Sequence, residues 1–338
     1  MLSFAVWVTE KCNLRCNYCY EKKRFEQRAD LTEDIEDILD FIVFIAREYK
    51  DEDVVLTFHG GEPLLKYNLI KRFVCGLKQI LGERIEFGIT TNGILLTDEM
   101  IDFLSENFVD VSISIDGIKE IHDRNRIFPT GEGSFDYAIN SMNKLKDNGL
   151  EVRARMTLTP ESVRHFYESI KFLYMKKIKY IVPAIAVNDL RWNQNDFLNL
   201  WHEVDRLVED GYGDIPFFKR IINGPIELSK CSGGIKSFNI ACDKRVYPCE
   251  YVVGDSKFKL GTVCNPKEVI ENGKKYAEIY SKENVGECRT CSYKKYCEAS
   301  RCKLFNYMNT GDVLCPSDNQ CQVEHLKYNI WRKYSCQK

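Results

Sequence analysis

Two observations predict an α/β fold with a parallel sheet, followed by a cysteine-rich α+β region. Apolar, strand-like runs alternate six times with amphipathic helical patterns, which is typical of a parallel sheet with right-handed crossovers, either doubly wound or curled like a barrel. The second observation is the distribution of the 15 cysteines: only Cys75 lies between Cys19 and Cys231, and eleven fall from Cys231 to Cys336. The cysteines therefore form two zones that are separated by an ordinary α/β body.

The alternation places six strands and the helices between them. The clearest helical pattern covers residues 31–49, where apolar residues recur at helical spacing and Thr32 provides a cap. The expected strands are 3–9, 54–58, 84–90, 109–115, 151–158 and 180–187. The other expected helices are 67–81, 97–106, 135–148, 161–175 and 197–209. The expected domains are a barrel over 1–187, a helical linker over 188–228 and a cysteine-rich domain over 229–338.

The composition is that of a soluble chain with a real core. Hydrophobic residues make up 44% of the 338 residues and charged residues 29%, and the net charge is −2. This net charge does not indicate a basic surface that would bind nucleic acid. Residues 3–8 are too few for a signal peptide, and no apolar run approaches membrane-spanning length. We therefore expect a cytoplasmic protein with neither a nucleic-acid nor a membrane partner.

Three cysteines stand in one short loop after the first expected strand: Cys12, Cys16 and Cys19. In a reducing compartment, clustered cysteines indicate a metal site rather than disulfides. Three thiolates from one loop can hold three irons of a 4Fe–4S cubane and leave the fourth iron open for chemistry. A structural zinc site is the alternative, but it usually has a fourth Cys or His nearby.

Glycine-rich and polar motifs follow the next three expected strands. They are His59-Gly60-Gly61-Glu62-Pro63, Thr91-Asn92-Gly93 and Ser114-x-Asp116-Gly117. Taken singly, each motif is ordinary turn sequence. In a parallel barrel, however, the loops after the strands share one rim, where active sites are built. We therefore expect these motifs and the cysteine loop to form one site.

The cysteine loop with Tyr18, the three rim motifs and His122-Asp123-x-x-Arg126 together resemble the radical S-adenosylmethionine (SAM) enzymes, in particular their peptide- and protein-modifying branch. The resemblance implies a partial (β/α)6 radical SAM barrel that binds SAM on the 4Fe–4S cluster and produces a 5′-deoxyadenosyl radical. It also implies the SAM contacts. Gly60, Gly61 and Glu62 would hold the methionyl end, and Thr91, Asn92, Ser114 and Asp116 are candidates for the ribose and carboxylate. Arg126 is a candidate partner of the carboxylate, with Arg155 as its rival and a structural salt bridge as the alternative. His59 and His122 are expected to be turn or packing residues.

The C-terminal cysteines resemble the SPASM extension, whose members carry two auxiliary 4Fe–4S clusters. Two departures from its pattern are Lys244 in place of a glycine and four residues, instead of three, between Cys297 and Cys302. A zinc-ribbon-like knot is the alternative, and Cys75 and Cys336 are expected to be incidental thiols. The resemblance implies Cys231, Cys242, Cys249 and Cys302 for auxiliary cluster one, with Cys264 and Cys315 as rivals of Cys242, and Cys288, Cys291, Cys297 and Cys321 for cluster two.

Glu250 directly follows Cys249, at the place where the related anaerobic sulfatase maturases have an Asp that acts as a base. It is therefore the candidate catalytic base, with a solvated or capping carboxylate as the alternative. The resemblance implies an oxidoreductase that modifies a ribosomally made peptide, by a thioether or carbon–carbon crosslink. Oxidation of a Cys or Ser to formylglycine, as in the sulfatase maturases, is the alternative reaction.

The implied partners are a precursor peptide or protein and a flavodoxin- or ferredoxin-type reductant. Because the chain opens almost directly on its first strand, we also expect recognition by the barrel itself or by a separate leader-binding protein. A non-catalytic iron–sulfur electron carrier or redox sensor is the alternative of a different class. The rim motifs argue against it, since a carrier needs no SAM pocket.

Overall fold

The computed structural model describes residues 1–23, 28–107, 109–224 and 226–335. Its described part contains one sheet of nine strands in the order β6-β5-β4-β3-β2-β1-β7-β8-β9. The strands are β1 (Leu2–Thr9), β2 (Val54–Gly60), β3 (Ile85–Thr91), β4 (Val109–Ser114), β5 (Arg153–Leu158), β6 (Tyr180–Ile185), β7 (Ser237–Ile240), β8 (Arg245–Tyr247) and β9 (Gly261–Thr262). The first six strands pair in parallel, which confirms the predicted α/β class.

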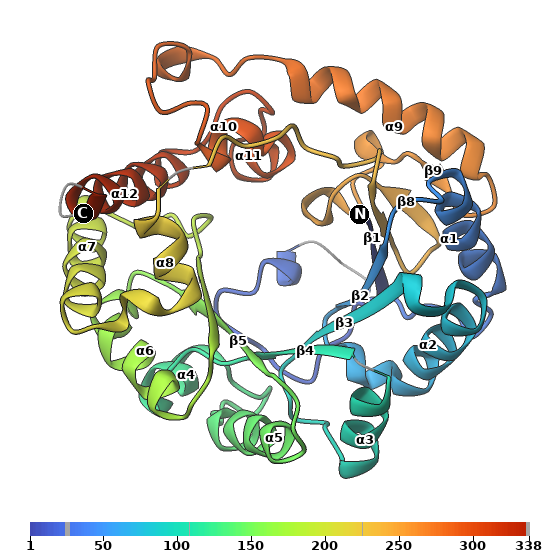
Figure 1. Ribbon diagram of the computed structural model, residues 1–338, viewed down its shortest axis with the longest axis horizontal. Helices are drawn as coiled ribbons and strands as arrows, with labels where there is room; N and C mark the ends of the chain where they lie inside the picture. The colour runs from blue at the N-terminus through green and yellow to red at the C-terminus, as the bar shows by residue number, and fades with distance from the viewer. Residues whose placement is uncertain (24–27, 108, 225, 336–338) are drawn as a thin grey trace.

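Helices cover the outer side of the curled sheet (Figure 1). The helices are α1 (Glu36–Glu48), α2 (Tyr67–Leu81), α3 (Asp98–Glu106), α4 (Lys119–Asn125), α5 (Phe135–Asp147), α6 (Phe166–Met175), α7 (Gln194–Glu209), α8 (Pro216–Ile222), α9 (Pro266–Ser281), α10 (Glu298–Arg301), α11 (Lys303–Thr310) and α12 (Asp318–Ser335). The described helices include none that combines the length and apolarity that crossing a membrane demands.

The first helix begins later than its apolar pattern predicts. It starts at Glu36 after Ile35, which provides no side-chain cap. Thr32 lies outside the helix, and its hydroxyl donates to the carbonyl oxygen of Asp34 at 3.2 Å. Leu31 is buried and continues the apolar face, but it does so from extended backbone, since its amide donates to Val8 of β1 at 3.1 Å. Apolar spacing alone does not separate these two cases.

The cysteine-rich part shares the sheet of the barrel. β7 pairs in parallel with β1, with Phe4 opposite Phe238, and these two rings stack at 5.7 Å. β8 and β9 then extend the sheet in antiparallel fashion. The expected boundary near residue 228 therefore separates two stretches of sequence but does not interrupt the sheet.

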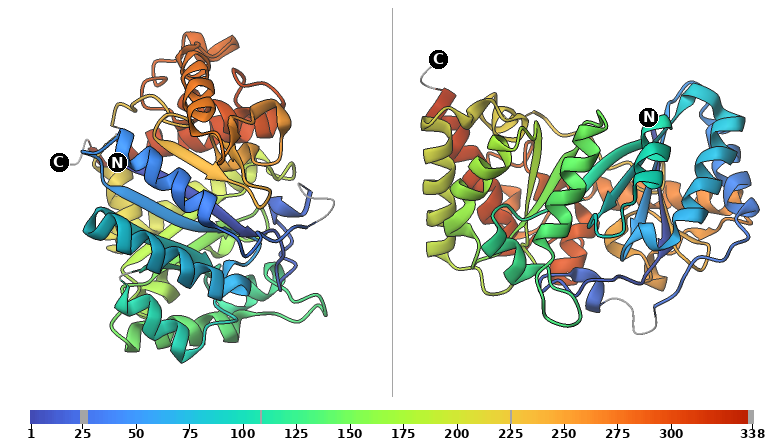
Figure 2. Two further views of the ribbon diagram at one scale, coloured as in Figure 1. Left: turned by 90° about the vertical axis from the view of Figure 1, so that its right-hand side faces the viewer. Right: turned by 90° about the horizontal axis from the view of Figure 1, so that it is seen from below.

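The C-terminal helices close the open side of the curl. α12 packs on α7 and α8, and α9 contacts α1. Figures 1 and 2 show the segment from α9 to α12 running between these two sides of the barrel. Tyr334 and Lys333 of α12 both bind Asp205 of α7, with the Tyr334 hydroxyl 2.6 Å and the Lys333 Nζ 2.5 Å from its Oδ1. The molecule is thus a ring that the cysteine-rich segment closes (Figure 1).

Candidate functional site

The two glycines after β2 bring that strand against the start of the cysteine loop. The amide of Gly61 donates to the carbonyl of Thr9 at 2.9 Å, and the amide of Glu62 donates to that of Lys11 at 2.9 Å. Gly60 has a φ of +135°, and a Cβ there would lie 1.9 Å from the Thr9 oxygen; a Cβ on Gly61 would lie 2.2 Å from the Lys11 oxygen. No side chain fits at either position, so the glycine pair is what lets the cysteine loop lie on the rim.

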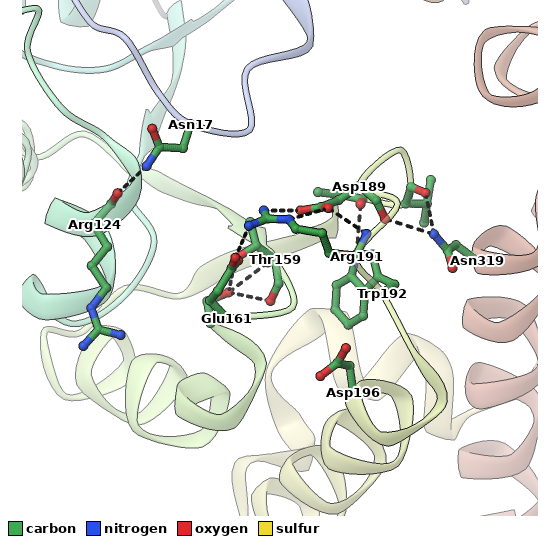
Figure 3. A network of polar contacts seen from close by, with 12 residues as sticks. Asn17, Arg124, Thr159, Glu161, Asp189, Arg191, Trp192, Asp196 and Asn319 are labelled. Carbon is green, nitrogen blue, oxygen red and sulfur yellow. Dashed lines mark hydrogen bonds and ion pairs between the residues drawn. The ribbon is translucent and has the colours of Figure 1, made fainter.

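The cysteine loop is also held from the other side, by the last residues of α4 and the segment that follows it. The amides of Arg15 and Asn17 donate to the carbonyls of Ile127 at 2.7 Å and Asn125 at 2.9 Å. The Asn17 side chain adds a hydrogen bond to the Arg124 carbonyl at 2.6 Å (Figure 3). The backbone of the loop is therefore fixed by contacts with two different rim segments.

The thiol environment in this loop suits iron. Cys12, Cys16 and Cys19 are each half-buried. Burial raises the pKa of Cys12 to about 12, and the nearby charge of Glu62 also raises it. A thiolate at this position requires a compensating positive charge, which a coordinating metal supplies. The three cysteines thus fit the cluster that the sequence predicts for them.

Glu62 is a buried carboxylate that joins two rim motifs. Its side chain is almost fully enclosed, at 1% exposure. It accepts hydrogen bonds from the amide of Leu64 at 3.1 Å, the hydroxyl of Thr91 at 2.6 Å and the amide of Asn92 at 2.8 Å. Burial raises its pKa, while these three hydrogen bonds lower it. Among the described residues no Lys, Arg or His forms an ion pair with it, so its surroundings suit an ammonium group such as that of SAM.

The other rim polar residues lie beside the cysteine loop. The Asn92 side-chain amide donates to Asn13 at 2.7 Å and lies 4.0 Å from the Cys12 sulfur. Ser114 ends β4 and is only partly buried, opposite Arg155 of β5. The structure therefore brings Thr91, Asn92 and Ser114 to the same rim as the cysteine loop, as the order of strands and loops predicts.

Asp116 and Arg126 are engaged with each other. The Arg126 Nε lies 3.1 Å from Asp116 Oδ2, and both side chains are buried. The same carboxylate accepts the Tyr18 hydroxyl at 2.5 Å and, through Oδ1, the amide of Thr157 at 3.0 Å. The Arg126 guanidinium also lies 5.3 Å from the centre of the Tyr18 ring. This is the structural salt bridge that the sequence left open, and it ties the cysteine loop to β4 and β5.

His59 and Glu250 form a polar group beside Cys249 that was not expected from the sequence, which indicated each of the two residues separately. His59, at the end of β2, places its Nδ1 4.0 Å from Glu250 Oε2. Burial lowers the pKa of His59, while Glu250 raises it and Arg155 lowers it. The Glu250 and Arg155 charges also act on the Tyr251 hydroxyl. The motif His59-Gly60-Gly61 contained a signal for this group, because His59 is the last residue before the glycines that end β2.

The C-terminal cysteines form two groups. In the first, Cys249 is half-buried. Desolvation is the largest cause that raises its pKa, and the charges of Glu250, Cys302 and Cys231 raise it further. The Tyr280 hydroxyl stands among the same three cysteines, is buried and has no hydrogen-bond partner. An orphaned donor beside three thiols suits the sulfides or thiolates of a cluster. The first group therefore has three cysteines: Cys231, Cys249 and Cys302.

The second group lies at the start of α12. Burial is the largest cause that raises the pKa of Cys321, and the charges of Cys288 and Cys291 raise it further. Burial likewise raises the pKa of Cys297, followed by the charge of Glu324 and, with a smaller effect, that of Cys321. The extra residue between Cys297 and Cys302 is taken up by the short helix α10. Within the described residues, no three His, Cys, Asp or Glu side chains converge on one ion position. A cubane binds its thiolates through separate irons and needs no such convergence.

The expected fourth ligand of the first group has other surroundings. Cys242 is buried, and its thiol donates to the carbonyl of Trp7 in β1 at 3.0 Å. Its rivals are exposed: Cys264 lies 3.8 Å from an Asp37 oxygen of α1, and Cys315 lies 3.8 Å from the Pro316 carbonyl. None of these contacts involves the first group. Cys75 is exposed on α2, and Cys336 lies outside the described residues.

The loop after β6 fastens the second cysteine group to the barrel (Figure 3). Asn319, two residues before Cys321, donates to the carbonyls of Val187 at 3.0 Å and Asp189 at 3.2 Å. The Asp189 side chain binds Arg191, and the Trp192 indole donates to the Ala186 carbonyl at 2.9 Å. The start of α12 is therefore positioned by the strand-end side of the barrel.

Comparisons with known proteins agree with this geometry. A family model described as the radical SAM superfamily matches residues 7–173. The cysteine-type anaerobic sulfatase-maturating enzyme of Clostridium novyi (strain NT) is 25% identical over 91% of each chain. The serine-type enzyme of Bacteroides thetaiotaomicron is 32% identical, over 53% of this chain and 46% of its own length.

Solved structures share the fold along nearly the whole chain. Native anSMEcpe with bound AdoMet has a TM-score of 0.80 and 22% identity, and the match covers 100% of this chain and 97% of that one. Streptococcus suis SuiB bound to the precursor peptide SuiA has a TM-score of 0.68 and 20% identity, over 95% of this chain and 76% of that one. The fold likeness therefore includes the cysteine-rich segment.

These findings confirm the predicted family and the prediction of an enzyme, and they do not support the alternative of a non-catalytic electron carrier. The matched residues contain the loop with Cys12, Cys16 and Cys19 and the rim motif with Glu62. The chain therefore belongs to the radical SAM superfamily and is an enzyme that binds SAM and a 4Fe–4S cluster.

Proposed function

We propose that this enzyme is a maturase that oxidises a residue within a peptide or protein. The observation that carries the proposal is the carboxylate of Glu250, which directly follows Cys249 and lies 4.0 Å from His59. It occurs in a chain that resembles an anaerobic sulfatase-maturating enzyme over 91% of its length. A proton acceptor beside a cysteine group suits a reaction that removes both electrons and protons from its substrate.

SAM and the iron–sulfur clusters would supply the redox chemistry, and the protein must hold and orient them. When bound, SAM and a reduced SAM cluster would supply a 5′-deoxyadenosyl radical that takes a hydrogen atom, and an oxidised auxiliary cluster would supply an acceptor for one further electron. In the proposal, Cys12, Cys16 and Cys19 hold the SAM cluster, and Glu62 with its neighbouring backbone holds the methionyl end. Arg155 is the better candidate for the SAM carboxylate, because Arg126 is already paired with Asp116.

The proton that the substrate releases is assigned to Glu250, which lies next to His59. Loss of one hydrogen atom and one electron leaves the substrate residue with a proton to release, so that two hydrogens are lost in all. Glu250 receives this proton, and His59, whose pKa is lowered by burial, lies beside it with its Nδ1 4.0 Å from Glu250 Oε2. The side chain of Glu250 is 35% exposed, which leaves it a route to solvent.

The remaining cofactors are assigned to the two cysteine groups. Cys231, Cys249 and Cys302 would hold one auxiliary cluster, and Cys288, Cys291, Cys297 and Cys321 the other. Together with the SAM cluster this predicts about twelve irons per chain. A flavodoxin- or ferredoxin-type protein is the proposed reductant. The fourth ligand of the first auxiliary cluster is left unassigned, because Cys242 donates to Trp7 instead.

Two reactions are compatible with this chemistry, and each has an observation in its favour. Crosslinking of a ribosomal precursor peptide is favoured by the fold of SuiB, whose structure holds the precursor peptide SuiA. Formylglycine formation is favoured by the full-length similarity to a cysteine-type sulfatase-maturating enzyme. A peptide substrate is common to both, since a structure of anSMEcpe holds the Cp18Cys peptide.

The first test separates hydrogen abstraction from proton transfer. We expect the reconstituted enzyme with SAM and dithionite to form 5′-deoxyadenosine. In Glu250→Gln this should persist, whereas oxidised peptide product should fall by about a hundredfold or more, which is the usual contribution of a general base. Glu278→Gln, an exposed position on α9, is the matched control. Full product formation by Glu250→Gln would contradict the role of this carboxylate.

The second test separates the two reactions. A crosslinked peptide loses two hydrogens and does not react with a hydrazide. A formylglycine peptide carries an aldehyde and forms a hydrazone, and when it is made from cysteine it has also exchanged sulfur for oxygen. Tandem mass spectrometry with and without hydrazide, on a sulfatase-derived peptide and on a precursor peptide encoded beside the enzyme, distinguishes them. If neither peptide is changed although 5′-deoxyadenosine forms, the maturase proposal is wrong.

A further inference from the structure

The two C-terminal cysteine groups meet at one cavity with a strongly cationic wall. The cavity has a volume of about 230 Å³, and Cys231, Cys288 and Cys297 all line it. The acidic side chains in its wall are Glu227 and Glu283. Against these two stand seven cationic side chains, in a chain whose net charge is −2. They are Lys230, Lys282, Arg289, Lys294, Lys295, Arg301 and Lys303.

Lys303 differs from the other six because it is inside the protein. Its exposure is 3%, and it is the only lysine classed as buried among the described residues. Its Nζ donates to the side-chain oxygen of Asn284, which is itself 4% exposed. The Nδ2 of Asn284 has no hydrogen-bond partner. Lys303 and Asn284 therefore lie at the cavity wall with hydrogen-bond donors that have no protein acceptor among the described residues.

No carboxylate neutralises Lys303 in the part of the chain that the structure describes. The ion pairs of this region include Lys327 with Glu298 and Glu324, at 2.9 and 2.7 Å, but none that involves Lys303. The acidic neighbour Glu283 is exposed and lies 3.4 Å from Lys294. A buried ammonium without a counter-charge is unfavourable unless a bound anion replaces the lost hydration. Burial lowers the pKa of Lys303, and the groups whose negative charge raises it most are Cys288 and Cys297.

The position of Lys303 is fixed by its helix. It is the first residue of α11, directly after Cys302. In the same helix, the Asn306 side chain donates to the Ala299 carbonyl at 3.0 Å and accepts from Gln320 at 3.0 Å. These contacts join α11 to α10, which directly follows Cys297, and to α12, which contains Cys321. Lys303 therefore has little freedom to turn out to solvent.

We propose that Lys303 is the built-in counter-charge of the auxiliary cluster at Cys288, Cys291, Cys297 and Cys321, and that it raises the reduction potential of that cluster. The inference rests on the cluster assignment in the proposed function. A cubane with four thiolates is anionic, and its reduction adds one more negative charge. A fixed cation in a region of low dielectric constant favours the reduced form, and net charge is one of the factors that set cluster potentials. Lys303 would thus make this cluster a better acceptor of the electron that the substrate loses.

The test measures potentials rather than turnover. Anaerobically reconstituted Lys303→Met, Lys303→Arg and wild-type proteins are titrated under electron paramagnetic resonance, and the signal of the second auxiliary cluster is identified by its absence in Cys321→Ala. We expect Lys303→Met to lower the equilibrium constant for reduction of this cluster at least tenfold. For one electron this makes the reduction potential about 59 mV more negative. Lys303→Arg keeps the charge and should keep the potential.

Lys295→Met is the matched control, because Lys295 lines the same cavity but is exposed to solvent. It removes the same charge and should shift the potential far less, since water screens it. Loss of about four irons in Lys303→Met that is prevented in Lys303→Arg would equally support a counter-charge. Loss of iron in both variants would indicate a packing role and overturn the proposal.

The two proposals fail differently. An unchanged potential in fully iron-loaded Lys303→Met, or equal shifts in Lys303→Met and Lys295→Met, would overturn the role of Lys303 and leave the maturase proposal standing. A wild-type iron content near four per chain would instead overturn the auxiliary clusters, and the counter-charge with them.

Discussion

At the scale of single residues, Lys244 shows how this chain departs from a family pattern and still keeps the backbone that the pattern needs. It stands where the pattern has glycine, the residue that adopts a positive φ most readily. The structure gives Lys244 a φ of +63°, in the turn between β7 and β8. Such a conformation costs a lysine roughly 1–2 kcal/mol. Its Nζ lies 2.8 Å from Asp37 of α1, and this contact offsets part of the cost.

His122 is a residue whose burial has a measurable consequence. Its Nδ1 accepts the amide of Asp116 at 3.4 Å, and its Nε2 is 3.0 Å from the Ser134 hydroxyl. Burial, aided by the charges of Arg126 and Lys119, lowers the pKa of His122 to about 2. This placement agrees with the expectation of a packing residue, since a neutral imidazole links two turns.

We predict that His122 makes the protein less stable as the pH falls. In the folded state its pKa is about 2, whereas an unfolded histidine has a pKa near 6.5, so below that pH unfolding takes up a proton. Between pH 6.5 and 5 the free energy of unfolding should fall by about 2 kcal/mol more in the wild type than in His122→Gln. Urea denaturation at both pH values measures this difference. The exposed His325→Gln should keep the wild-type slope, and a His122→Gln slope equal to it would contradict the prediction.

At the scale of elements, the parts that the sequence predicts best are those whose ends are marked locally. The expected helix 67–81 matches α2 at both ends, because it follows a Pro-containing turn and ends at Gly82. α3 likewise begins at Asp98, directly after its cap Thr97. α4 was not predicted, since its seven residues are too few to show a helical period, whereas α8 lies within the helical linker expected over 188–228.

We predict that α12 depends on Asn319 for its attachment to the barrel. Asn319→Ala removes hydrogen bonds of 3.0 and 3.2 Å to the carbonyls of Val187 and Asp189. Loss of these bonds should lower the free energy of unfolding by about 1–2 kcal/mol. Gln322→Ala, at an exposed position on the same helix, is the control and should be nearly neutral. Equal stability of the two variants in chemical denaturation would show that the loop after β6 does not hold α12.

At the scale of the whole molecule, the two ends of the ring differ in how they are stabilised. One large apolar core runs from β1 through the barrel helices and into β7 and β8. The cysteine-rich segment adds a separate cluster of only four buried residues, Val252, Phe258, Tyr280 and Leu304. A cluster of this size contributes little, so iron bound by the cysteines would provide much of the local stability.

We therefore predict that removal of iron affects the two ends unequally. In anaerobic chelator-treated protein, proteases should cut preferentially between residues 282 and 303, whereas the barrel strands should stay protected. Limited proteolysis followed by mass spectrometry maps the cuts, with the iron-loaded protein as the control. Equal resistance of both forms would mean that packing alone holds the segment, against the proposed auxiliary clusters.

The sequence by itself determined the parallel α/β class, the three-cysteine loop on the rim and the family, because periodicity, spacing and short motifs are local properties. Only the tertiary structure decided which distant groups meet. It showed that β7 continues the barrel sheet, that the Cys242 thiol donates to Trp7, that Arg126 is paired with Asp116, and that Lys303 is buried at the wall of the cysteine cavity. These outcomes depend on contacts between residues far apart in the chain, and no local pattern encodes which of several equivalent side chains the packing turns inward.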